Sequence, residues 1–300
     1  MHFLAIPFPN IDPVLVQIGP VAIRWYALSY IAGFILGWMY LRYLLSKPDL
    51  WWPEGKGPRI ATKAQADDIL TWSILGVLIG GRVGWALFYQ LLPANRETFL
   101  SNPLEIFYVW HGGMSFHGGF LGVVIAIVLF CRSQKLDIAR IGDAIACSAP
   151  FGLCFGRVAN FINAEIWGKP TEVSWAVVFP NDPLKLPRHP SQLYEAALEG
   201  VALFLILFWL TQTFKILRRP GLATGCFLIL YSIFRIFVEV AFRDSNNKLG
   251  GGWTMGIVLS IPMAMAGLFY VWHAFEDRFG PMPLTRPLAK LSTHQAFNSK

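Results

Sequence analysis

The chain is poor in charged residues. Only 14% of its 300 residues are Asp, Glu, Lys or Arg, and 55% are hydrophobic, whereas soluble domains carry roughly a quarter of charged residues. This shortage excludes an ordinary soluble domain and predicts a membrane protein with several spans. A basic stretch ahead of the first apolar residues is also missing, and prolines interrupt residues 1–20. We therefore expect no cleaved signal peptide, and we expect the first span to stay in the mature protein.

The cysteines lack the spacing of a zinc site or of a disulfide framework. No two of them are separated by only two residues, and no pair of histidines lies close to them. All of them fall within or at the edge of apolar stretches, so we interpret them as buried thiols that pack like small apolar side chains. We expect neither a metal nor another cofactor. The four cysteines are Cys131, Cys147, Cys154 and Cys226.

Seven apolar stretches are long enough to cross a hydrocarbon core about 30 Å thick. They predict an all-α integral membrane protein with about seven transmembrane helices and a small head region on the outer face. The predicted spans are 21–45, 67–91, 115–131, 138–162, 193–213, 222–242 and 253–275.

Lysine and arginine are distributed unevenly between the two sides of this arrangement. The side that holds the odd-numbered connections and the C-terminus carries 15 of them, and the other side carries 6. The positive-inside rule therefore predicts an outer N-terminus and a cytoplasmic C-terminus. The net charge of +7 would then face anionic lipid headgroups. We expect no nucleic-acid partner, because no aromatic and basic surface module accompanies the charge.

The chain is organised as one membrane domain with two flanking segments. Residues 1–20 form an interfacial N-terminal arm, residues 21–275 form the membrane domain, and residues 276–300 form a polar cytoplasmic tail. The outer segment 163–192 belongs to the membrane domain and builds the head. Its residues 173–179 are rich in strand formers, which predicts short strands there.

Glycines spaced by four residues recur in the predicted spans. Small residues at this spacing allow two helix backbones to approach closely, so we interpret them as packing positions without chemistry. The sets are Gly33 and Gly37; Gly76, Gly80 and Gly84; Gly118 and Gly122; and Gly152 and Gly156.

An arginine, two asparagines and a glutamate lie at the end of the fourth span. Arg157 and Asn160 are three residues apart on one helix face, and Asn163 lies farther round towards the outer surface. Ionisable groups inside a membrane indicate a functional site by default, and a guanidinium can hold a phosphate through two parallel hydrogen bonds. The alternative is a structural arginine whose donors are taken up by backbone carbonyls.

A polar stripe runs along the sixth span. Tyr231, Arg235 and Glu239 are each four residues apart and therefore share one helix face. Arg235 and Glu239 would either contribute to a site or simply neutralise each other at this spacing. Arg82 in the second span has the same two interpretations.

Two residues near the outer ends of spans have a chemical and a structural interpretation. His117 can accept a proton near neutral pH, as a general base must, or it can be an interfacial histidine bonded to backbone. Tyr26 can contribute to a site or belong to the aromatic belt of the membrane surface. No Gly-x-Ser-x-Gly motif completes the two His-Gly-Gly tracts, which excludes a lipase-type hydrolase.

The tract 156–168 closely resembles the signature of the bacterial prolipoprotein diacylglyceryl transferases. The likeness covers nearly all of residues 7–275. Besides 156–168 it includes Arg24-Trp25-Tyr26, Gly80-Gly81-Arg82-Val83-Gly84, Met114-Ser115-Phe116-His117-Gly118-Gly119, Arg188-His189-Pro190-Ser191-Gln192-Leu193-Tyr194-Glu195 and Phe234-Arg235-Ile236.

The resemblance implies an enzyme of the bacterial inner membrane. It would move the diacylglyceryl group of phosphatidylglycerol onto the thiol of the lipobox cysteine of a preprolipoprotein. A thioether would form and glycerol phosphate would leave, which is the first step of lipoprotein maturation. Its partners would be phosphatidylglycerol, lipobox segments and membrane lipids.

The resemblance also assigns roles by position. Arg157 matches the family's phospholipid-binding arginine, and Arg235 matches a second important arginine, so we expect both to hold the phosphate. We expect His117 to help deprotonate the thiol. We also assign Arg235, Tyr26 and Asn160 to catalysis, and Asn160, Asn163, Gly168 and Tyr231 to phospholipid binding.

Two alternative functions remain, and the chain departs from the family's pattern in two places. A transporter of an anionic solute would use Arg82, Arg157 and Arg235 to line its pathway, and a non-catalytic scaffold would bind phospholipid or lipoproteins. The segment 240–247 departs from the family's usual Phe-Arg-x-Pro-Asp pattern, and Ile257 stands where a glutamine often follows Met-Gly. The departures lie at the outer ends of the last two spans.

Overall fold

The computed structural model describes most of the chain. Its described residues fall into two compact units, of which the first lies within 1–58 and 142–280 and the second within 59–141. The described residues are 5–9, 11–19, 21–92, 95–108, 112–244 and 253–276.

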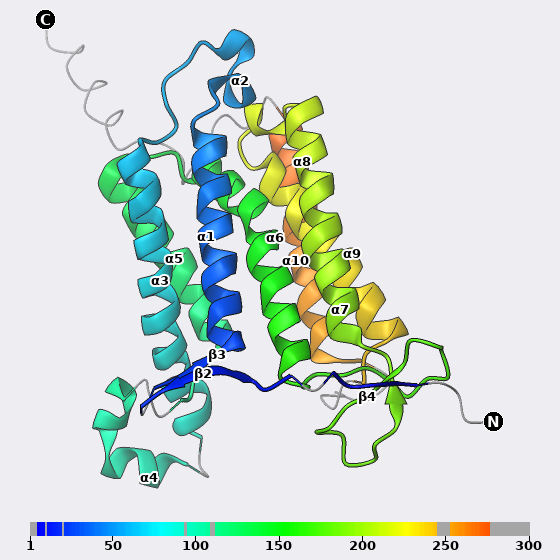
Figure 1. The fold of residues 1–300 in the computed structure, drawn as a ribbon. Helices are drawn as coiled ribbons and strands as arrows, with labels where there is room; N and C mark the ends of the chain where they lie inside the picture. Colours follow the sequence, from blue (N-terminus) through cyan, green and yellow to red (C-terminus); the bar gives the residue numbers. More distant parts are fainter. Residues whose placement is uncertain are drawn as a thin grey trace, which may run out of the picture. The chain divides into compact units, whose positions relative to one another are not determined.

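Among the described residues, seven helices are long and apolar enough to span a membrane. Their number and approximate bounds confirm the spans predicted from the sequence (Figure 1). They are α1 (Trp25–Leu45), α3 with η2 (Lys63–Gln90), α5 (Phe116–Gln134), α6 (Ile138–Ile162), α7 to α8 (Ser191–Thr213), α9 (Leu222–Ala241) and α10 (Met255–Phe275).

Two of the spans contain a π-type turn, and short helices lie between the spans. The fifth span is built from α7 (Ser191–Glu195), a wide π-type turn η5 (Ala196–Ala202) and α8 (Leu203–Thr213). The second span likewise consists of α3 (Lys63–Trp85) and the π-type turn η2 (Ala86–Gln90). The short helices between the spans are α2 (Pro48–Trp51), η1 (Pro53–Gly55), α4 (Arg96–Ser101), η3 (Pro103–Phe107) and η6 (Ile216–Arg218).

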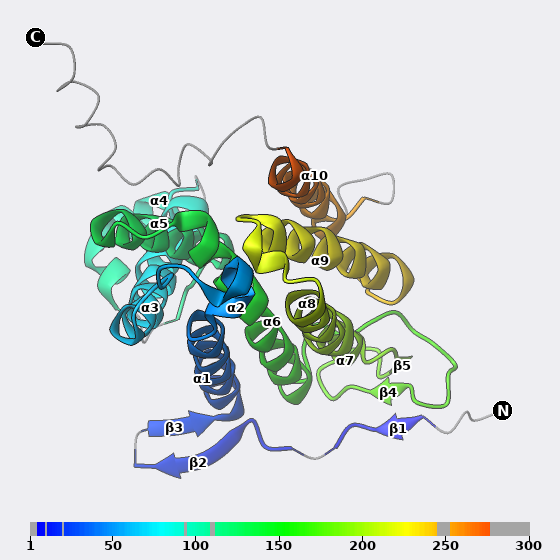
Figure 2. The same cartoon turned by 90° about the horizontal axis from the view of Figure 1, so that it is seen from above.

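The first span begins at Trp25 rather than at residue 21. The preceding residues form strand β3 (Val21–Arg24), which pairs antiparallel with β2 (Val14–Ile18). Figure 2 shows this hairpin at the start of α1. The β-branched residues in this segment favour a strand, but they also continue the apolar run that predicts a helix. The sequence alone therefore assigned them to the span.

A carboxylate fixes the start of α9 against α6 in the first unit. Asp143 of α6 is fully buried. It accepts hydrogen bonds from the backbone N–H groups of Gly221 at 2.7 Å and Thr224 at 2.8 Å, and from the Thr224 hydroxyl at 2.8 Å. The first N–H groups of a helix have no partner within the helix. Asp143 therefore sets the position of α9 relative to α6.

Glycines bring α3 and α5 together in the second unit. A Cβ atom built on Gly76 would lie 2.7 Å from the Gly122 carbonyl oxygen, and one built on Gly84 would lie 2.6 Å from the Gly118 Cα. No larger side chain fits without separating the helices. The interpretation as packing positions is confirmed for the glycines of α3 and α5, whereas a Cβ on Gly152 or Gly156 of α6 would meet nothing within 4 Å. Cysteines add no covalent link, because all four are free, and Cys131 and Cys147 are buried.

The segment after α6 forms a small head. Its strand β4 (Val177–Val178) pairs in parallel with β1 (Ile6–Pro7) and antiparallel with β5 (Pro187–Arg188). The strands expected within 173–179 are thereby confirmed at two residues. Phe179 is fully buried beneath them and stacks on Trp167 at 5.9 Å between ring centroids.

A buried ion pair ties the head to the end of α9. The Arg188 Nε lies 2.6 Å from Asp182 Oδ2, and its Nη1 lies 2.8 Å from Asp244 Oδ2. Hydrogen bonds from Arg188, followed by those from the backbone of Leu184 and Leu186, hold the pKa of Asp182 below its usual range against the opposing effect of burial. The head therefore has a fixed attachment to the segment that follows α9.

Candidate functional site

Three arginines and three glutamates meet inside the first unit, and we call them the arginine–glutamate cluster. They come from α6, from the start of the fifth span and from α9 with the residues just after it. The members are Arg157, Glu195, Glu199, Arg235, Glu239 and Arg243.

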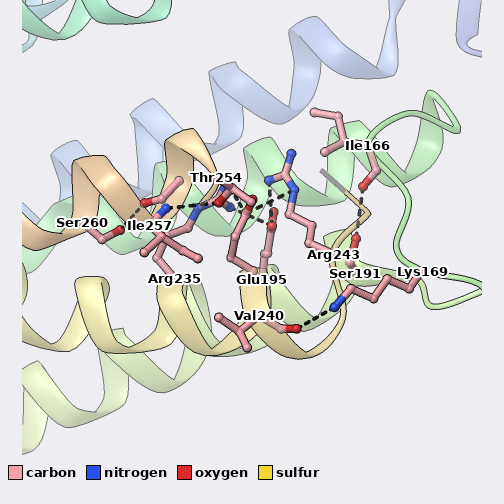
Figure 3. A network of polar contacts seen from close by, with 12 residues as sticks. Ile166, Lys169, Ser191, Glu195, Arg235, Val240, Arg243, Thr254, Ile257 and Ser260 are labelled. Carbon is pink, nitrogen blue, oxygen red and sulfur yellow. Dashed lines mark hydrogen bonds and ion pairs between the residues drawn. The ribbon is translucent and has the colours of Figure 1, made fainter. Parts of the chain in front are cut away.

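Glu195 lies at the centre of the cluster. Its carboxylate is fully buried and contacts Arg157 Nε at 2.8 Å, Arg235 Nη1 at 2.7 Å and Arg243 Nη1 at 3.0 Å. Figure 3 shows this carboxylate with the guanidinium groups of Arg235 and Arg243. One acidic side chain therefore joins cations from two spans and from the segment after α9.

The other two carboxylates complete the network. Glu199 contacts both Arg157 and Arg235 at 3.5 Å. Glu239 contacts Arg235 Nη2 at 3.2 Å and Arg243 Nε at 3.5 Å. Arg235 and Glu239 do neutralise each other across one helical turn, which was one of the two interpretations of this pair. Because Arg235 also bonds Glu195, that local pairing is only part of its environment.

Asn160 links the cluster to the tract that follows α6. Its amide nitrogen donates to Glu165 Oε1 at 2.7 Å, and its oxygen lies 3.5 Å from Arg157 Nη1. Tyr26, which was also assigned to the site, lies in the first turn of α1, and its hydroxyl is hydrogen-bonded to that of Tyr30 at 3.2 Å.

Tyr231 and Asn163 also belong to the first unit. Tyr231 lies one turn before Arg235 on α9 and is close enough to Arg157 and Glu199 to interact electrostatically with them. Asn163 lies just past the end of α6, and its carbonyl accepts from Asn181 at 3.1 Å. The structure thus brings Tyr231 to the cluster, whereas the phospholipid contact expected of Asn163 stays a prediction.

Gly168 lies between two chain segments at the edge of the head. Its N–H donates to the His189 carbonyl at 2.9 Å, and the next residue donates to the Phe242 carbonyl at 2.8 Å. A Cβ on Gly168 would lie 2.5 Å from the Phe242 oxygen and 2.8 Å from the His189 oxygen. Glycine is required here because backbone flanks it on both sides.

We expect Gly168→Ala to lower kcat/KM by about 10²-fold, since displacements near 1 Å at a site have effects of this size. The extra methyl group would push apart the segments that lead into Glu195 and Arg243. Steady-state kinetics in detergent measures the loss. Gly152→Ala on α6 is the matched control, because a Cβ there meets nothing within 4 Å. Equal rates for both variants and the wild type would contradict this role.

His117 lies in the second unit, in the first turn of α5. It is exposed there. Ser115 begins the helix by accepting a hydrogen bond from the Gly118 N–H at 3.2 Å. The proton-transfer role assigned to His117 stays a prediction.

The buried Arg82 of α3 donates its hydrogen bonds to backbone carbonyls. Its guanidinium bonds the carbonyls of Glu105, Ile106, Gly112 and Gly113 and lies 4.3 Å from the Trp85 ring centroid. Of the two interpretations of Arg82, this contact set supports the structural one. The residue anchors the connection between α3 and α5.

Three members of the cluster, Glu195, Glu199 and Arg243, have no role predicted from the sequence. Glu195 and Glu199 repeat, in the fifth span, the spacing of four that drew attention to the sixth. Buried acids at this spacing in an apolar run were a usable signal. Arg243 was noted only as part of the unusual segment 240–247, whose residues from 245 onwards lie outside the described residues.

Comparison with known proteins gives consistent matches. Residues 13–273 match the family model described as prolipoprotein diacylglyceryl transferase. The chain is 52% identical over 268 residues to the phosphatidylglycerol–prolipoprotein diacylglyceryl transferase of Rhodospirillum rubrum, covering 88% of this chain and 92% of that protein. It is 47% identical over 287 residues to the protein of the same name from Phenylobacterium zucineum, covering 92% and 96% respectively.

Proposed function

The chain belongs to the prolipoprotein diacylglyceryl transferase family, and on that premise we propose that its arginine–glutamate cluster holds the phosphate of phosphatidylglycerol. The protein is a multi-pass enzyme of the bacterial inner membrane. It transfers a diacylglyceryl group from phosphatidylglycerol to a prolipoprotein cysteine. Family membership removes the transporter and the non-catalytic scaffold as alternatives.

One observation carries the proposal, namely the difference in exposure between the cations and the anions of the cluster. The side chains of Arg157, Arg235 and Arg243 are 19%, 13% and 16% exposed. Those of the three glutamates are 0 to 1% exposed. The exposed side chains of the cluster are therefore cationic, and the buried carboxylates orient them.

The proposed reaction needs such a cationic surface. The thiol sulfur of the lipobox cysteine forms a bond to the glyceryl carbon of the lipid, and the bond from that carbon to the phosphate oxygen breaks. The thiol proton passes to a base, for which we propose His117 below, and glycerol phosphate departs with the bonding electrons. Negative charge on the leaving phosphate grows as its ester bond breaks, so fixed guanidinium groups lower the barrier. We assign this role to Arg157 and Arg235.

The remaining site residues support these two arginines. Asn160, held by Glu165, presents its oxygen towards Arg157 and orients that guanidinium. Tyr231, one turn before Arg235 on α9, and Tyr26 are phenols that we assign as donors for the lipid headgroup. Asn163 is proposed as a further headgroup donor at the outer surface. Gly168 contributes through the close approach of the segments on either side of it.

The test of the proposal is an assay with purified protein, phosphatidylglycerol and a lipobox peptide. Glycerol phosphate release and a diacylglyceryl mass gain on the peptide are measured together. Loss of both products in variants of Arg157 or Arg235 that remain folded supports the proposal. Full turnover in those variants would remove the cluster from the reaction.

We propose His117 as the group that helps to remove the thiol proton. A free cysteine has a pKa of about 8.5, so a nearby base increases the reactive thiolate. His117→Gln is expected to lower kcat by about 10²-fold and to change the pH dependence of kcat. The pH–rate profile checks this, with His273→Gln in the last turn of α10 as the control. An unchanged profile would assign the proton to another group.

We propose an outer N-terminus and a cytoplasmic C-terminus, with an N-terminal arm at 1–20, the catalytic membrane domain at 21–275 and a tail at 276–300. The support is the unequal distribution of lysine and arginine. In a cysteine-free background, Lys185→Cys should react with a membrane-impermeant maleimide on intact cells, and Lys56→Cys should not. The reverse labelling pattern would invert the orientation.

A further inference from the structure

The chain turns sharply just after α6, within the tract that carries Asn160. Ala164 and Ile166 both adopt positive φ angles, 51° and 60°. Residues other than glycine rarely adopt this conformation, and a β-branched isoleucine does so at a particular cost. Such a conformation persists only where the surrounding structure holds it. The contacts that hold this turn therefore decide where the side chain of Glu165, between the two strained residues, is placed.

Side chains at the start of α7 supply two of these contacts. The Ser191 hydroxyl donates to the Ile166 carbonyl at 3.1 Å, and the Gln192 Nε2 donates to the Glu165 carbonyl at 2.5 Å. Figure 3 shows Ser191 beside Ile166. Both donors are fully buried. The Asn181 side chain donates to the carbonyls of Asn163 and Ala164, just before this part of the turn, but it is exposed.

The held turn leads directly to the proposed site. The Glu165 side chain accepts from Asn160 at 2.7 Å, and the Asn160 oxygen faces Arg157 at 3.5 Å. A continuous series of contacts thus joins Gln192, the Glu165 backbone and side chain, Asn160 and the guanidinium of Arg157. In the described part of the chain, the hydrogen bonds that the Ser191 and Gln192 side chains donate go to this turn and not to an arginine of the cluster.

The burial of Gln192 indicates that its donor is needed at this place. Its Oε1 atom is buried and has no hydrogen-bond partner among the described residues. Burying an unpaired amide oxygen costs free energy, and an apolar side chain of similar size would avoid that cost. The bond from Nε2 to the Glu165 carbonyl is the contribution that a glutamine makes and an apolar residue cannot.

We propose that Ser191 and Gln192 are positioning residues for the Asn160–Glu165 pair, acting through the strained turn at 164–166. This inference rests on the proposed function of the cluster. It gives a role to the part of the tract 188–195 that precedes Glu195. Losing either donor lets the turn relax, moves Glu165 and releases Asn160 from the orientation that faces Arg157.

The test uses the full-length enzyme in detergent with phosphatidylglycerol and a lipobox peptide. Gln192→Met keeps the length of the side chain and removes the amide group, both its oxygen and its nitrogen. We expect it to lower kcat/KM by about 10²-fold, the effect of a displacement near 1 Å at a site. Gln212→Met is the matched control, because it makes the same change at the other end of the same span. Gln212 Nε2 has no partner in the described structure, so we expect its rate to stay within about threefold of the wild type.

Serine variants give a readout that a merely structural role would not produce. Ser191→Ala removes the hydroxyl and is expected to be about tenfold slower than the wild type, a loss equivalent to one hydrogen bond. Ser191→Thr keeps the hydroxyl and should recover most of that loss. Melting temperatures are measured for every variant. Slow variants with a wild-type melting temperature support positioning.

Two outcomes would overturn the inference. One is a Gln192→Met rate within about threefold of the wild type, which is far from the expected loss; the other is Ser191→Thr being as slow as Ser191→Ala. If Gln192→Met fails to fold, the serine pair decides alone. Arg157→Ala is assayed in parallel. If it is inactive while Gln192→Met is normal, only the positioning role fails; if Arg157→Ala is fully active, the proposed function of the cluster fails.

Discussion

Arg157→Ala is expected to lower kcat/KM for phosphatidylglycerol by about 10³-fold, the upper end of the effect of removing one preorganised donor group. The guanidinium that is lost would contact the phosphate in the ground state and bind it more strongly as the ester bond breaks. Its side chain is 19% exposed, so it can reach a lipid headgroup without leaving the cluster. Glycerol phosphate release at several lipid concentrations gives the two kinetic constants separately.

The conservative variant distinguishes the geometry of Arg157 from its charge. Arg157→Lys keeps the positive charge but replaces the planar, two-pronged donor with a single ammonium group. We expect its rate to lie between those of the wild type and Arg157→Ala. Arg132→Ala, which changes an exposed arginine at the end of α5, is the control for general effects of charge removal. A normal rate for Arg157→Ala in folded protein would contradict the assigned role.

Glu195→Ala is expected to be the most destabilising single change in the cluster. It leaves Arg157, Arg235 and Arg243 without the carboxylate that contacts all three at 2.7 to 3.0 Å. Removing one partner of a buried ion pair costs about 3–5 kcal/mol, because the remaining charge is left uncompensated. We expect a clear fall in the melting temperature in detergent, together with loss of activity.

Glu199→Ala is the matched comparison for this effect. Glu199 lies in the same span and is just as buried, but its contacts with Arg157 and Arg235 are both 3.5 Å long. We expect its melting temperature to fall less than that of Glu195→Ala. Equal falls would mean that total charge, rather than the central position of Glu195, holds the three arginines together.

The sequence predicted the membrane spans well because long uncharged runs rarely form anything but transmembrane helices. It placed the start of the first span wrongly at residue 21. Val21 and Ile23 are apolar and continue the run, yet they belong to a strand that pairs with residues 14–18. Here the pairing with a neighbouring segment decides whether an apolar residue belongs to a strand or to a helix. The periodicity of a short stretch of sequence contains no information about that pairing.

The candidate site was predicted in part. Arg157, Asn160, Arg235 and Tyr231 were selected from the sequence, and the structure places all four in or beside one cluster. Glu195 was missed as the centre, since nothing local specifies that a carboxylate some forty residues away will pair with Arg157 and Arg235. Partner choice among buried charges is a tertiary property. The role of His117 stays a prediction from the resemblance.

The role of Arg157 and Arg235 in holding the phosphate of phosphatidylglycerol is tested most directly by equilibrium lipid binding. Binding is measured by native mass spectrometry of the wild type and of Arg157→Ala and Arg235→Ala. Phosphatidylglycerol is compared with a diacylglycerol of the same acyl chains, which lacks the phosphate. We expect each variant to bind phosphatidylglycerol about tenfold or more weakly, because one charge-assisted bond is lost, and to bind diacylglycerol as the wild type does. Unchanged phosphatidylglycerol binding in both folded variants would contradict it.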